Sequence, residues 1–409
     1  MEVLHPRCAG LDVHKKTVVA AFRIQEGNQV EVTVETFPTT TSGLLDLCGR
    51  IEELRIGHAA MEATGVYWKP VWHVLSGHVE LLLANARHVK NLPGRKSDVK
   101  DAEWIADLDA HGLITGSFVP PADQQDLRNL TRTRVQLVRE RTRHVARLHK
   151  VLEDANIKLT SFISDVLGVS GRRVLAAIIA GETDPDLLLK NLLVPRLKAK
   201  AEDLRESLRG FLRDHHRFML KLHLEQIDSI DEAISRLDVR IDGHLRPFRY
   251  ARELLTTVPG LSTTAANVVL AEVGADMSHF PTGNHLVSWA CLCPRSDSSA
   301  GKRRSKRTMK GSHWLKPVLV QCAWSAVRVK GSYLRTLYYR LRARRGSKRA
   351  IIAVAASMLE SIYHMLRDGV EYADLGAEHF DRVDQISYAD RLVKKLQRSG
   401  YEVTIRKVA

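Results

Sequence analysis

Short apolar segments, separated by helical patterns, make up the first 110 residues of the chain. Apolar runs and alternating valines are typical of β-strands, which we expect over residues 8–11, 17–24, 29–37, 59–63 and 79–84. The first two flank a short polar turn and predict a hairpin. Helical periodicity predicts helices over residues 42–54 and 66–75 and a third that begins near Ser97. The pattern therefore indicates an α/β domain.

From Asp123 to about Asn156 the pattern becomes continuously helical. Seven arginines lie on this segment, and no glycine or proline interrupts it. Leucines recur at spacings of three, four or multiples of seven, at Leu127, Leu130, Leu137, Leu148 and Leu152. This spacing predicts a long basic helix that forms half of a coiled coil. Residues 196–209 and 217–245 predict further helices, so we interpret this part as a helical arm, either a spacer or a dimerising element.

The third part of the chain begins near Phe248 and is mainly helical by pattern. Residues 258–262, Val-Pro-Gly-Leu-Ser, precede a small-residue helix with the spacing of a helix–hairpin–helix. Backbone amides at such a turn can hold a phosphate, although a plain tight turn between core helices fits the same residues. Further helices are expected over residues 314–329, 333–344 and 347–366. We therefore divide the chain into residues 1–120, 121–247 and 248–409.

Composition favours a polyanionic partner. The chain has 62 Lys and Arg against 47 Asp and Glu, a net charge of +15, and basic side chains release counterions when they bind phosphates. A merely basic soluble protein remains the alternative. No run of eighteen apolar residues and no signal-peptide pattern is present, so we expect a cytoplasmic protein without membrane spans. Five scattered cysteines are typical of reduced thiols, and no zinc spacing accompanies Cys291 and Cys293.

Four acidic residues of the first domain stand at the ends of predicted elements. Asp12 and Glu62 each end an apolar strand, while Asp98 and Asp101 are three apart at the start of a predicted helix and share one face. Four carboxylates at one point would repel one another, and Mg2+ (or Mn2+), which prefers oxygen ligands, would relieve that repulsion. Individually, the pair could be ordinary first-turn acids and Glu62 a salt-bridged strand end.

A serine-rich and strongly basic segment follows residue 294. Ser298 and Ser299 stand beside small residues, so a hydroxyl there is open to act as a nucleophile if a base or a metal activates it. A solvated surface loop is the alternative. Basic residues that can bind phosphates follow the serines, and others precede the Asp pair. They are Lys302, Arg303, Arg304, Lys306, Arg307 and Lys310, and Arg87, Lys90 and Arg95.

Several motifs together resemble those of a known family. The acidic motifs are Leu11-Asp12-Val13-His14, residues 61–67 (Met-Glu-Ala-Thr-Gly-Val-Tyr) and residues 96–102 (Lys-Ser-Asp-Val-Lys-Asp-Ala). The later motifs are residues 292–294, 299–303, 307–311, 363–366 and 400–404. The set resembles the DEDD transposases of the "one-ten" family of bacterial insertion sequences over nearly the whole chain.

This resemblance implies an RNase H-like (RuvC-like) N-terminal domain in which Asp12, Glu62, Asp98 and Asp101 hold Mg2+. It implies a C-terminal transposase domain whose serine, best matched by Ser299 with Ser298 adjacent, forms a covalent phosphoserine link to DNA. A structured non-coding bridge RNA encoded by the element would guide donor and target DNA. The subunits would form dimers that pair into tetramers near the bacterial nucleoid, with sites built from one subunit's acidic domain and another's serine.

Two other functions fit parts of the pattern. A RuvC-like junction endonuclease would share the four carboxylates and hydrolyse DNA with water, without using the serine. A non-catalytic nucleic-acid-binding scaffold would use the acidic residues only as structural ends. The leucine spacing of the arm favours a transposase in which a partner helix comes from a neighbouring subunit.

Overall fold

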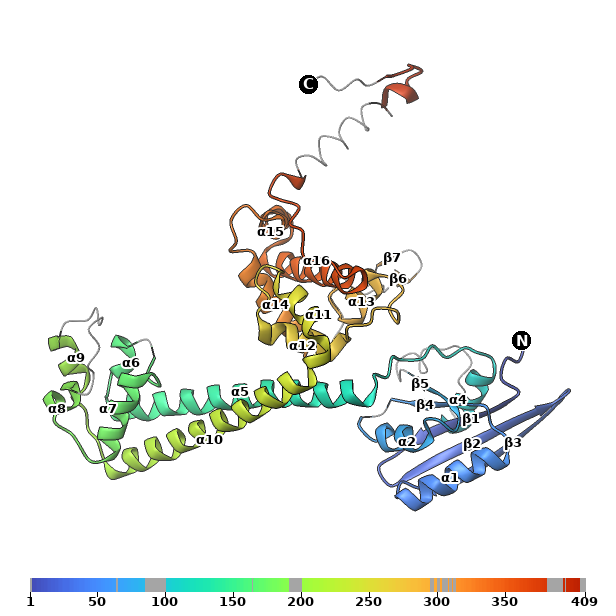
Figure 1. Ribbon diagram of the computed structural model, residues 1–409, viewed down its shortest axis with the longest axis horizontal. Coiled ribbons are helices and arrows are strands. Elements are labelled where there is room, and N and C mark those ends of the chain that lie inside the picture. The colour runs from blue at the N-terminus through green and yellow to red at the C-terminus, as the bar shows by residue number, and fades with distance from the viewer. Residues whose placement is uncertain are drawn as a thin grey trace. The chain divides into compact units, whose positions relative to one another are not determined.

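In the computed structural model the chain forms two compact units, Met1–Pro120 and Pro121–Ala409 (Figure 1). It describes residues 2–63, 65–84, 101–163, 165–190, 201–294, 298–299, 302–303, 308, 311, 314–380, 393 and 395–404. The expected helix start at Ser97 lies outside these residues.

The N-terminal unit is built on a five-stranded mixed sheet of order β3-β2-β1-β4-β5. β2 is antiparallel to both β1 and β3, whereas β4 is parallel to both β1 and β5. The strands are β1 (Arg7–Val13), β2 (Thr17–Glu26), β3 (Gln29–Pro38), β4 (His58–Glu62) and β5 (Glu80–Ala84). The predicted hairpin and α/β class are thus confirmed, and the arrangement fits an RNase H-like domain.

Helices cover both faces of this sheet. They are α1 (Thr41–Glu53), α2 (Trp68–Leu75) and α4 (Asp101–Ala110). Side chains of α1 and α2 share one apolar core with Ala9, Leu11 and Met61. Alternate strand positions face α4 instead, because successive side chains of a strand point to opposite faces; Ala60 accordingly packs with Ile105 of α4.

One carboxylate is buried within α4. The side chain of Asp109 is almost inaccessible, and its Oδ2 has no hydrogen-bond partner among the described residues. Burial raises the pKa of the Asp109 carboxyl from 3.8 to about 6, because an ionised carboxylate is poorly solvated there. Between these two pH values the folded unit keeps the Asp109 proton that the unfolded chain releases. The free energy of unfolding therefore falls as the pH rises from about 4 through 6.

Replacement of Asp109 by asparagine is expected to stabilise the N-terminal unit near neutral pH by up to about 3 kcal/mol. The variant carries no charge to bury, so its advantage shrinks to nothing as the pH falls below about 4. Hydrogen exchange of the β1 amides, corrected for intrinsic rates at each pH, measures the difference. Asp107→Asn, at a half-exposed neighbour, is the control, and an equal gain in that variant would contradict the burial argument.

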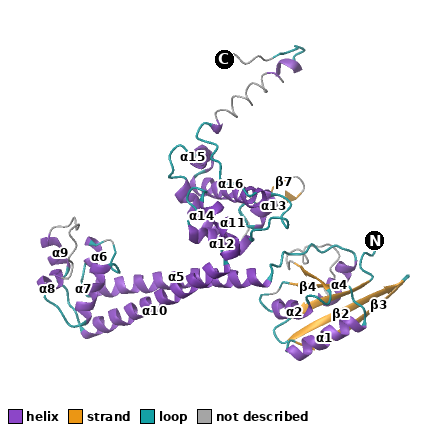
Figure 2. Ribbon diagram, viewed as in Figure 1, coloured by secondary structure: helices purple, strands orange, loops and turns teal. Residues whose placement is uncertain are grey.

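The second unit begins with a helical arm (Figure 2). Its helices are α5 (Ala122–Asp154), α6 (Leu159–Phe162), α7 (Val169–Ile179), α8 (Pro185–Lys190), α9 (Ala201–Ser207) and α10 (Asp214–His244). Figure 1 shows α5 and α10 side by side. They are antiparallel, since Arg134 of α5 pairs with Asp238 of α10 and Arg141 pairs with Asp231.

The long basic helix is confirmed as α5. Its row of leucines, the leucine seam, packs against α10 of the same chain. Leu148 and Leu152 of α5 share a core with Leu220 and Ile227 of α10. At the other end, Leu127 packs with Ile241. The seam that we interpreted as the surface for a partner subunit's helix is thus filled by α10. The leucine spacing therefore gives no argument for a second subunit, because an intramolecular hairpin buries it equally well.

The rest of the second unit is a helical body with one short β-hairpin. Its elements are η1 (Arg246–Phe248), α11 (Arg249–Thr256), α12 (Thr263–Val273), α13 (Gly283–Trp289), β6 (Ser298–Ser299), β7 (Lys302–Arg303), α14 (Leu315–Ala326), α15 (Tyr333–Arg345) and α16 (Ser347–Asp368). Among described helices, α16 alone is long and apolar enough to cross a membrane by length and composition. Half of its apolar window is buried in the body, as expected of a core helix.

The turn between α11 and α12 packs against α14. Gly260 has φ of +81°, and a Cβ there would lie 2.6 Å from the Cys322 carbonyl oxygen and the Ala326 amide. Ser262 caps α12 by accepting a hydrogen bond from the Ala265 amide. The expected Pro-Gly turn between two helices is present, and its glycine is required by close packing as well as by backbone conformation.

Candidate functional site

Asp12 and Glu62 lie at the carboxyl ends of two adjacent parallel strands, β1 and β4. Leu11 of β1 pairs with Met61 of β4, and each carboxylate follows its strand's member of that pair. The carboxyl ends of parallel strands meet at one edge of a sheet, so the two acids stand side by side. Both are partly buried. By strand alternation both face the side of the sheet that α4 covers, because Leu11 and Met61 face the opposite core.

Asp101 is brought toward this edge by the contact between α4 and β1. Gly10, two residues before Asp12, lies directly against α4: a Cβ at Gly10 would lie 2.1 Å from the Ala102 carbonyl oxygen and 2.4 Å from the Ala106 amide nitrogen. Asp101 is the first residue of α4 and immediately precedes Ala102. Absence of a side chain at one position of β1 thus lets the start of α4 lie next to the strand that carries Asp12.

We call the edge of the sheet near Asp12, Glu62 and Asp101 the acidic edge. Its carboxylate oxygens are the ligands that Mg2+ and Mn2+ take. The Asp12, Glu62 and Asp101 oxygens do not, however, form a close metal-binding cluster in the part of the chain that the structure describes. One Asp12 oxygen instead lies 3.1 Å from Nε2 of His14, a contact that a metal would have to displace. Asp98 and the basic residues Arg87, Lys90 and Arg95 lie outside the described residues.

The backbone of Ser298 and Ser299 forms one strand of a short β-hairpin. β6 and β7 are antiparallel, with Ser298 opposite Arg303 and Ser299 opposite Lys302. A backbone bridge between Pro294 and Thr308 closes the base of this segment. Of the other basic residues, Arg304, Lys306, Arg307 and Lys310 lie outside the described part.

Lys316 of α14 fixes the base of the hairpin. Its ammonium group donates hydrogen bonds to the Cys291 carbonyl oxygen at 2.9 Å and to the Thr308 hydroxyl at 3.0 Å. The lysine thereby ties the two ends of the serine-bearing segment to the helical body. Sequence reasoning missed this residue, because its partners are 25 and 8 positions away and belong to no helical or strand pattern.

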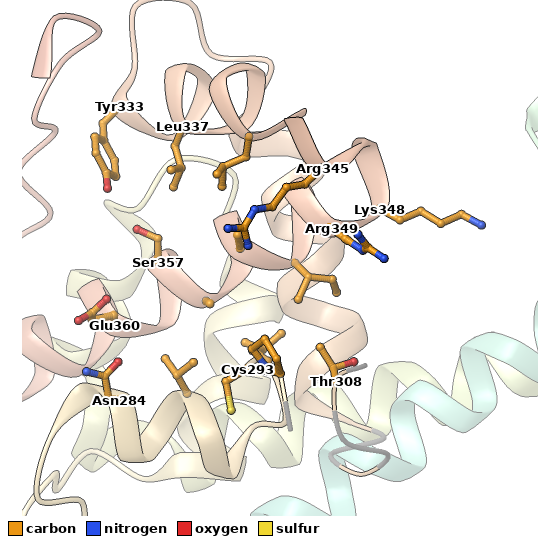
Figure 3. Close-up of a pocket in the computed structure, with 17 residues that line it drawn as sticks. Asn284, Cys293, Thr308, Tyr333, Leu337, Arg345, Lys348, Arg349, Ser357 and Glu360 are labelled. Carbon is orange, nitrogen blue, oxygen red and sulfur yellow. The ribbon is translucent and has the colours of Figure 1, made fainter. Parts of the chain in front are cut away.

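A pocket of about 1200 Å³ opens beside the hairpin base (Figure 3). Its wall is mostly apolar and comes from α13, α15 and α16, and Cys293, Pro294 and Thr308 contribute from the ends of the hairpin segment. Figure 3 shows three exposed cations, Arg345, Lys348 and Arg349, on the side of the pocket nearest Thr308. None of the three forms an ion pair with a carboxylate among the described residues.

Sequence reasoning also missed these three cations, which we call the basic rim of the pocket. Arg345 ends α15 while Lys348 and Arg349 begin α16, so Gly346 at the junction brings the three together. A glycine between two helical patterns, flanked on both sides by basic residues, was the available signal. Unpaired exposed cations next to an apolar pocket suit a ligand with anionic groups and flat apolar surfaces, as nucleic acids have.

Comparison with known families matches both units. Residues 9–157 match a DEDD transposase model of the IS110 group, which is described as a transposase. Residues 252–339 match a model described as the transposase IS116/IS110/IS902 family. The first match covers Asp12, Glu62, Asp98 and Asp101, and the second covers Ser299 and the basic hairpin. Together the two matches span more than half of the chain.

Individual relatives carry similar descriptions. A probable family 20 transposase of Pseudomonas aeruginosa is 28% identical over 66% of this chain and 71% of its own length. An uncharacterized 42 kDa protein of insertion element IS900 from Mycobacterium paratuberculosis is 24% identical over 72% of this chain and 80% of its own. The transposase for insertion sequence element IS1328 of Yersinia enterocolitica is 28% identical over 56% and 58%, respectively.

Proposed function

Because the chain belongs to the IS110 family of insertion-sequence transposases, we propose that it cuts and rejoins DNA with two catalytic elements. The first is the acidic edge of the N-terminal unit, formed by Asp12, Glu62, Asp98 and Asp101. The second is Ser299 on the β6–β7 hairpin. The observation that carries the proposal is the position of Asp12 and Glu62 at the same edge of the sheet, on the face covered by α4.

The carboxylates would hold Mg2+ or Mn2+. When bound, such ions activate an attacking oxygen and stabilise a leaving oxygen in phosphoryl transfer. The protein's own contribution is to place Asp12 and Glu62 at one edge of the sheet and, through Gly10, to let the start of α4 lie against β1. Carboxylates on two adjacent strand ends and at the start of α4 supply the oxygen ligands that such ions take, and this supports a metal-binding role.

Ser299 would act as the nucleophile. Its Oγ would attack a DNA phosphorus, so that an Oγ–P bond forms and the P–O bond to one DNA strand breaks. The serine proton leaves to a base or to solvent, and the oxygen of the released strand takes up a proton to become a hydroxyl. The resulting phosphoserine keeps the energy of the phosphodiester, and attack by a DNA hydroxyl would reverse the step and join a new strand. The ties of Lys316 at the hairpin base support this role, since a nucleophile must be held in place.

A DNA cleavage assay tests the proposal directly. Junction DNA of the element is incubated with Mg2+ and the element RNA, and products are compared on a denaturing gel before and after protease. We expect a protease-sensitive protein–DNA adduct with the wild type and with Ser298→Ala. The adduct should disappear with Ser299→Ala and with Asp12→Asn. Free cleaved ends from Ser299→Ala would instead establish a hydrolytic endonuclease that attacks with water and would overturn the serine mechanism.

The same proposal includes a bridge RNA and a dimer that pairs into tetramers, as the resemblance implies. Omitting the RNA should abolish cleavage of the element's DNA. If composite sites form, mixing Asp12→Asn subunits with Ser299→Ala subunits should restore part of the activity that each variant lacks. Failure of every mixture, at ratios where mixed oligomers are verified, would place both catalytic elements in one subunit.

The basic rim of the pocket is proposed to bind the DNA backbone near the hairpin. Lys348→Ala with Arg349→Ala is expected to weaken binding to single-stranded and duplex DNA of any sequence and to lower the salt-dependence slope by ~1 for each cation removed. Fluorescence anisotropy over a range of KCl concentrations measures both quantities. Arg249→Ala, which removes an exposed arginine paired with Glu253 on α11, is the matched control and should leave the slope unchanged.

A further inference from the structure

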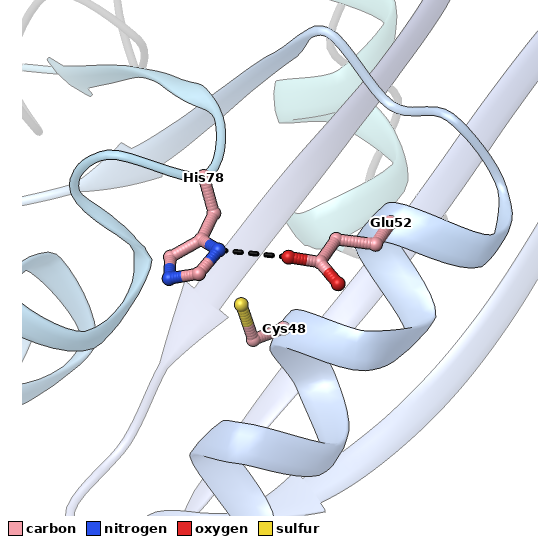
Figure 4. A group of neighbouring side chains, drawn as sticks. All are labelled: Cys48, Glu52 and His78. Carbon is pink, nitrogen blue, oxygen red and sulfur yellow. Dashed lines mark hydrogen bonds and ion pairs between the residues drawn. The ribbon is translucent and has the colours of Figure 1, made fainter.

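We propose that Cys48, Glu52 and His78 form a second metal site in the N-terminal unit, suited to Zn2+ rather than Mg2+. One potential ligand atom from each residue lies within 4.8 Å of the other two. Figure 4 shows the Cys48 sulfur pointing toward the His78 ring and the Glu52 carboxylate. Among the described residues this is the one group of three such side chains that is close enough to share an ion.

The donor set decides the kind of ion. Thiolate sulfur, imidazole nitrogen and carboxylate oxygen are the three ligand types that Zn2+ takes, whereas Mg2+ and Ca2+ avoid sulfur. Three protein ligands leave a fourth tetrahedral position for water. This site is therefore chemically distinct from the all-carboxylate edge at Asp12 and Glu62, and it does not depend on the proposed transposase mechanism.

The backbone positions these side chains before any ion binds. Cys48 and Glu52 are one turn apart on α1, so both project from the same side of the helix. His78 lies in a tight turn held by the hydrogen bond from its amide to the Leu75 carbonyl oxygen and by the bridge between Ser76 and Val79. Glu52 Oε1 lies 2.8 Å from Nδ1 of His78, so the helix and the turn already meet at this point.

Only small movements would complete the geometry. With metal–ligand bonds of about 2.0–2.3 Å, tetrahedral ligand atoms are roughly 3.5 Å apart. Cys48 is 5% exposed and fixed by packing, while the side chains of His78 and Glu52 are 47% and 59% exposed and can adjust. The buried residue thus sets the position of the site, and the two exposed residues can close on an ion.

Metal binding would exchange a proton for the ion. Burial and the nearby Glu52 carboxylate raise the pKa of the Cys48 thiol above its ordinary value, so the sulfur is protonated without metal. On binding, the S–H bond breaks, a Zn–S bond forms and the proton passes to the buffer. The bound ion would tie α1 to the turn that precedes β5, and would stabilise the folded unit in proportion to the logarithm of the free Zn2+ concentration.

Co2+ serves as the spectroscopic probe of this site. The full-length protein is treated with chelator, exchanged into metal-free buffer and titrated with Co2+, followed by competition with Zn2+. We expect one equivalent of Co2+ to produce a thiolate-to-cobalt charge-transfer band, which Zn2+ removes. Zn2+ binding measured in two buffers of different ionisation enthalpy should release close to one proton.

Matched variants identify the ligands. Cys48→Ser should abolish the band, and His78→Gln should weaken Zn2+ affinity at least about 100-fold while circular dichroism stays unchanged. Cys293→Ser, which removes a half-buried thiol elsewhere, and Asp12→Asn, at the acidic edge, should both keep the band. Absence of the band in folded wild type, or its persistence in Cys48→Ser, would overturn the proposal, whatever the outcome of the DNA cleavage assay.

Discussion

Replacement of Gly10 by alanine is expected to disrupt the N-terminal unit and abolish DNA cleavage. The new Cβ would lie 2.1 Å from the Ala102 carbonyl oxygen and 2.4 Å from the Ala106 amide nitrogen, both backbone atoms of α4. Backbone cannot rotate away as a flexible side chain can, so α4 must move off β1 or the unit must unfold. Overpacking typically costs about 1–3 kcal/mol, and we expect the upper end of this range or more where backbone atoms must move. Either response removes Asp101 from the edge that carries Asp12 and Glu62.

Hydrogen exchange of β1 and α4 amides, together with the cleavage assay, measures this effect. Gly57→Ala is the matched control: it adds the same methyl group in the same unit, where no atom lies within 4 Å of the new Cβ. We expect the control to exchange and cleave like the wild type. Full activity and unchanged protection in Gly10→Ala would mean that the α4–β1 contact does not position the acidic residues.

Replacement of Glu272 by alanine is expected to loosen the attachment of the arm to the helical body. Glu272 is buried on α12 and accepts two hydrogen bonds of 2.7 Å from the Arg132 guanidinium of α5. Arg128 lies beside this pair and donates to the Ala271 carbonyl oxygen, and its burial lowers the pKa of Arg128 to about 10. Removing the carboxylate leaves buried positive charge without its partner, which costs about 3–5 kcal/mol.

Urea unfolding followed by tryptophan fluorescence measures this loss. The guanidinium groups of Arg128 and Arg132 lie over the rings of Trp289 and Trp314, so the two indoles report on the same contact. Glu253→Ala is the control, because it removes an exposed carboxylate paired with Arg249 and should cost less than about 1 kcal/mol. Equal destabilisation by the two substitutions would contradict a role for the buried pair in holding α5 on α12.

The two substitutions also differ in what they should do to catalysis. Gly10→Ala acts on the unit that carries the carboxylates, whereas Glu272→Ala acts on the attachment of the arm. If the proposed cooperation between acidic edge and serine is correct, Glu272→Ala should reduce adduct formation while leaving the N-terminal unit's amide protection intact. Loss of adduct formation with unchanged amide protection would show that the arm contributes to catalysis without stabilising the sheet.

Local pattern was sufficient for most elements of this protein. Alternating valines gave β3, an uninterrupted leucine and arginine pattern gave α5, and apolar runs ending in Asp12 and Glu62 placed both acids at strand ends. These properties depend on neighbours within a few residues, because strand alternation and helical periodicity are local. The motifs likewise identified the family, since short motifs in a fixed order survive where overall identity is low.

Tertiary structure alone decided which surfaces meet. The leucine seam of α5 predicts a partner helix but cannot say whether it belongs to the same chain, and α10 fills it. Lys316, the rim at Arg345 and the group at Cys48 depend on contacts between residues from separate elements, for which one sequence carries no periodic signal. Gly10 is an ordinary strand glycine until α4 lies on it. The sequence by itself thus determined the helices and strands and the chemical groups at their ends. Tertiary packing decided which elements contact one another, because the free energy of a contact depends on atoms that only folding brings together.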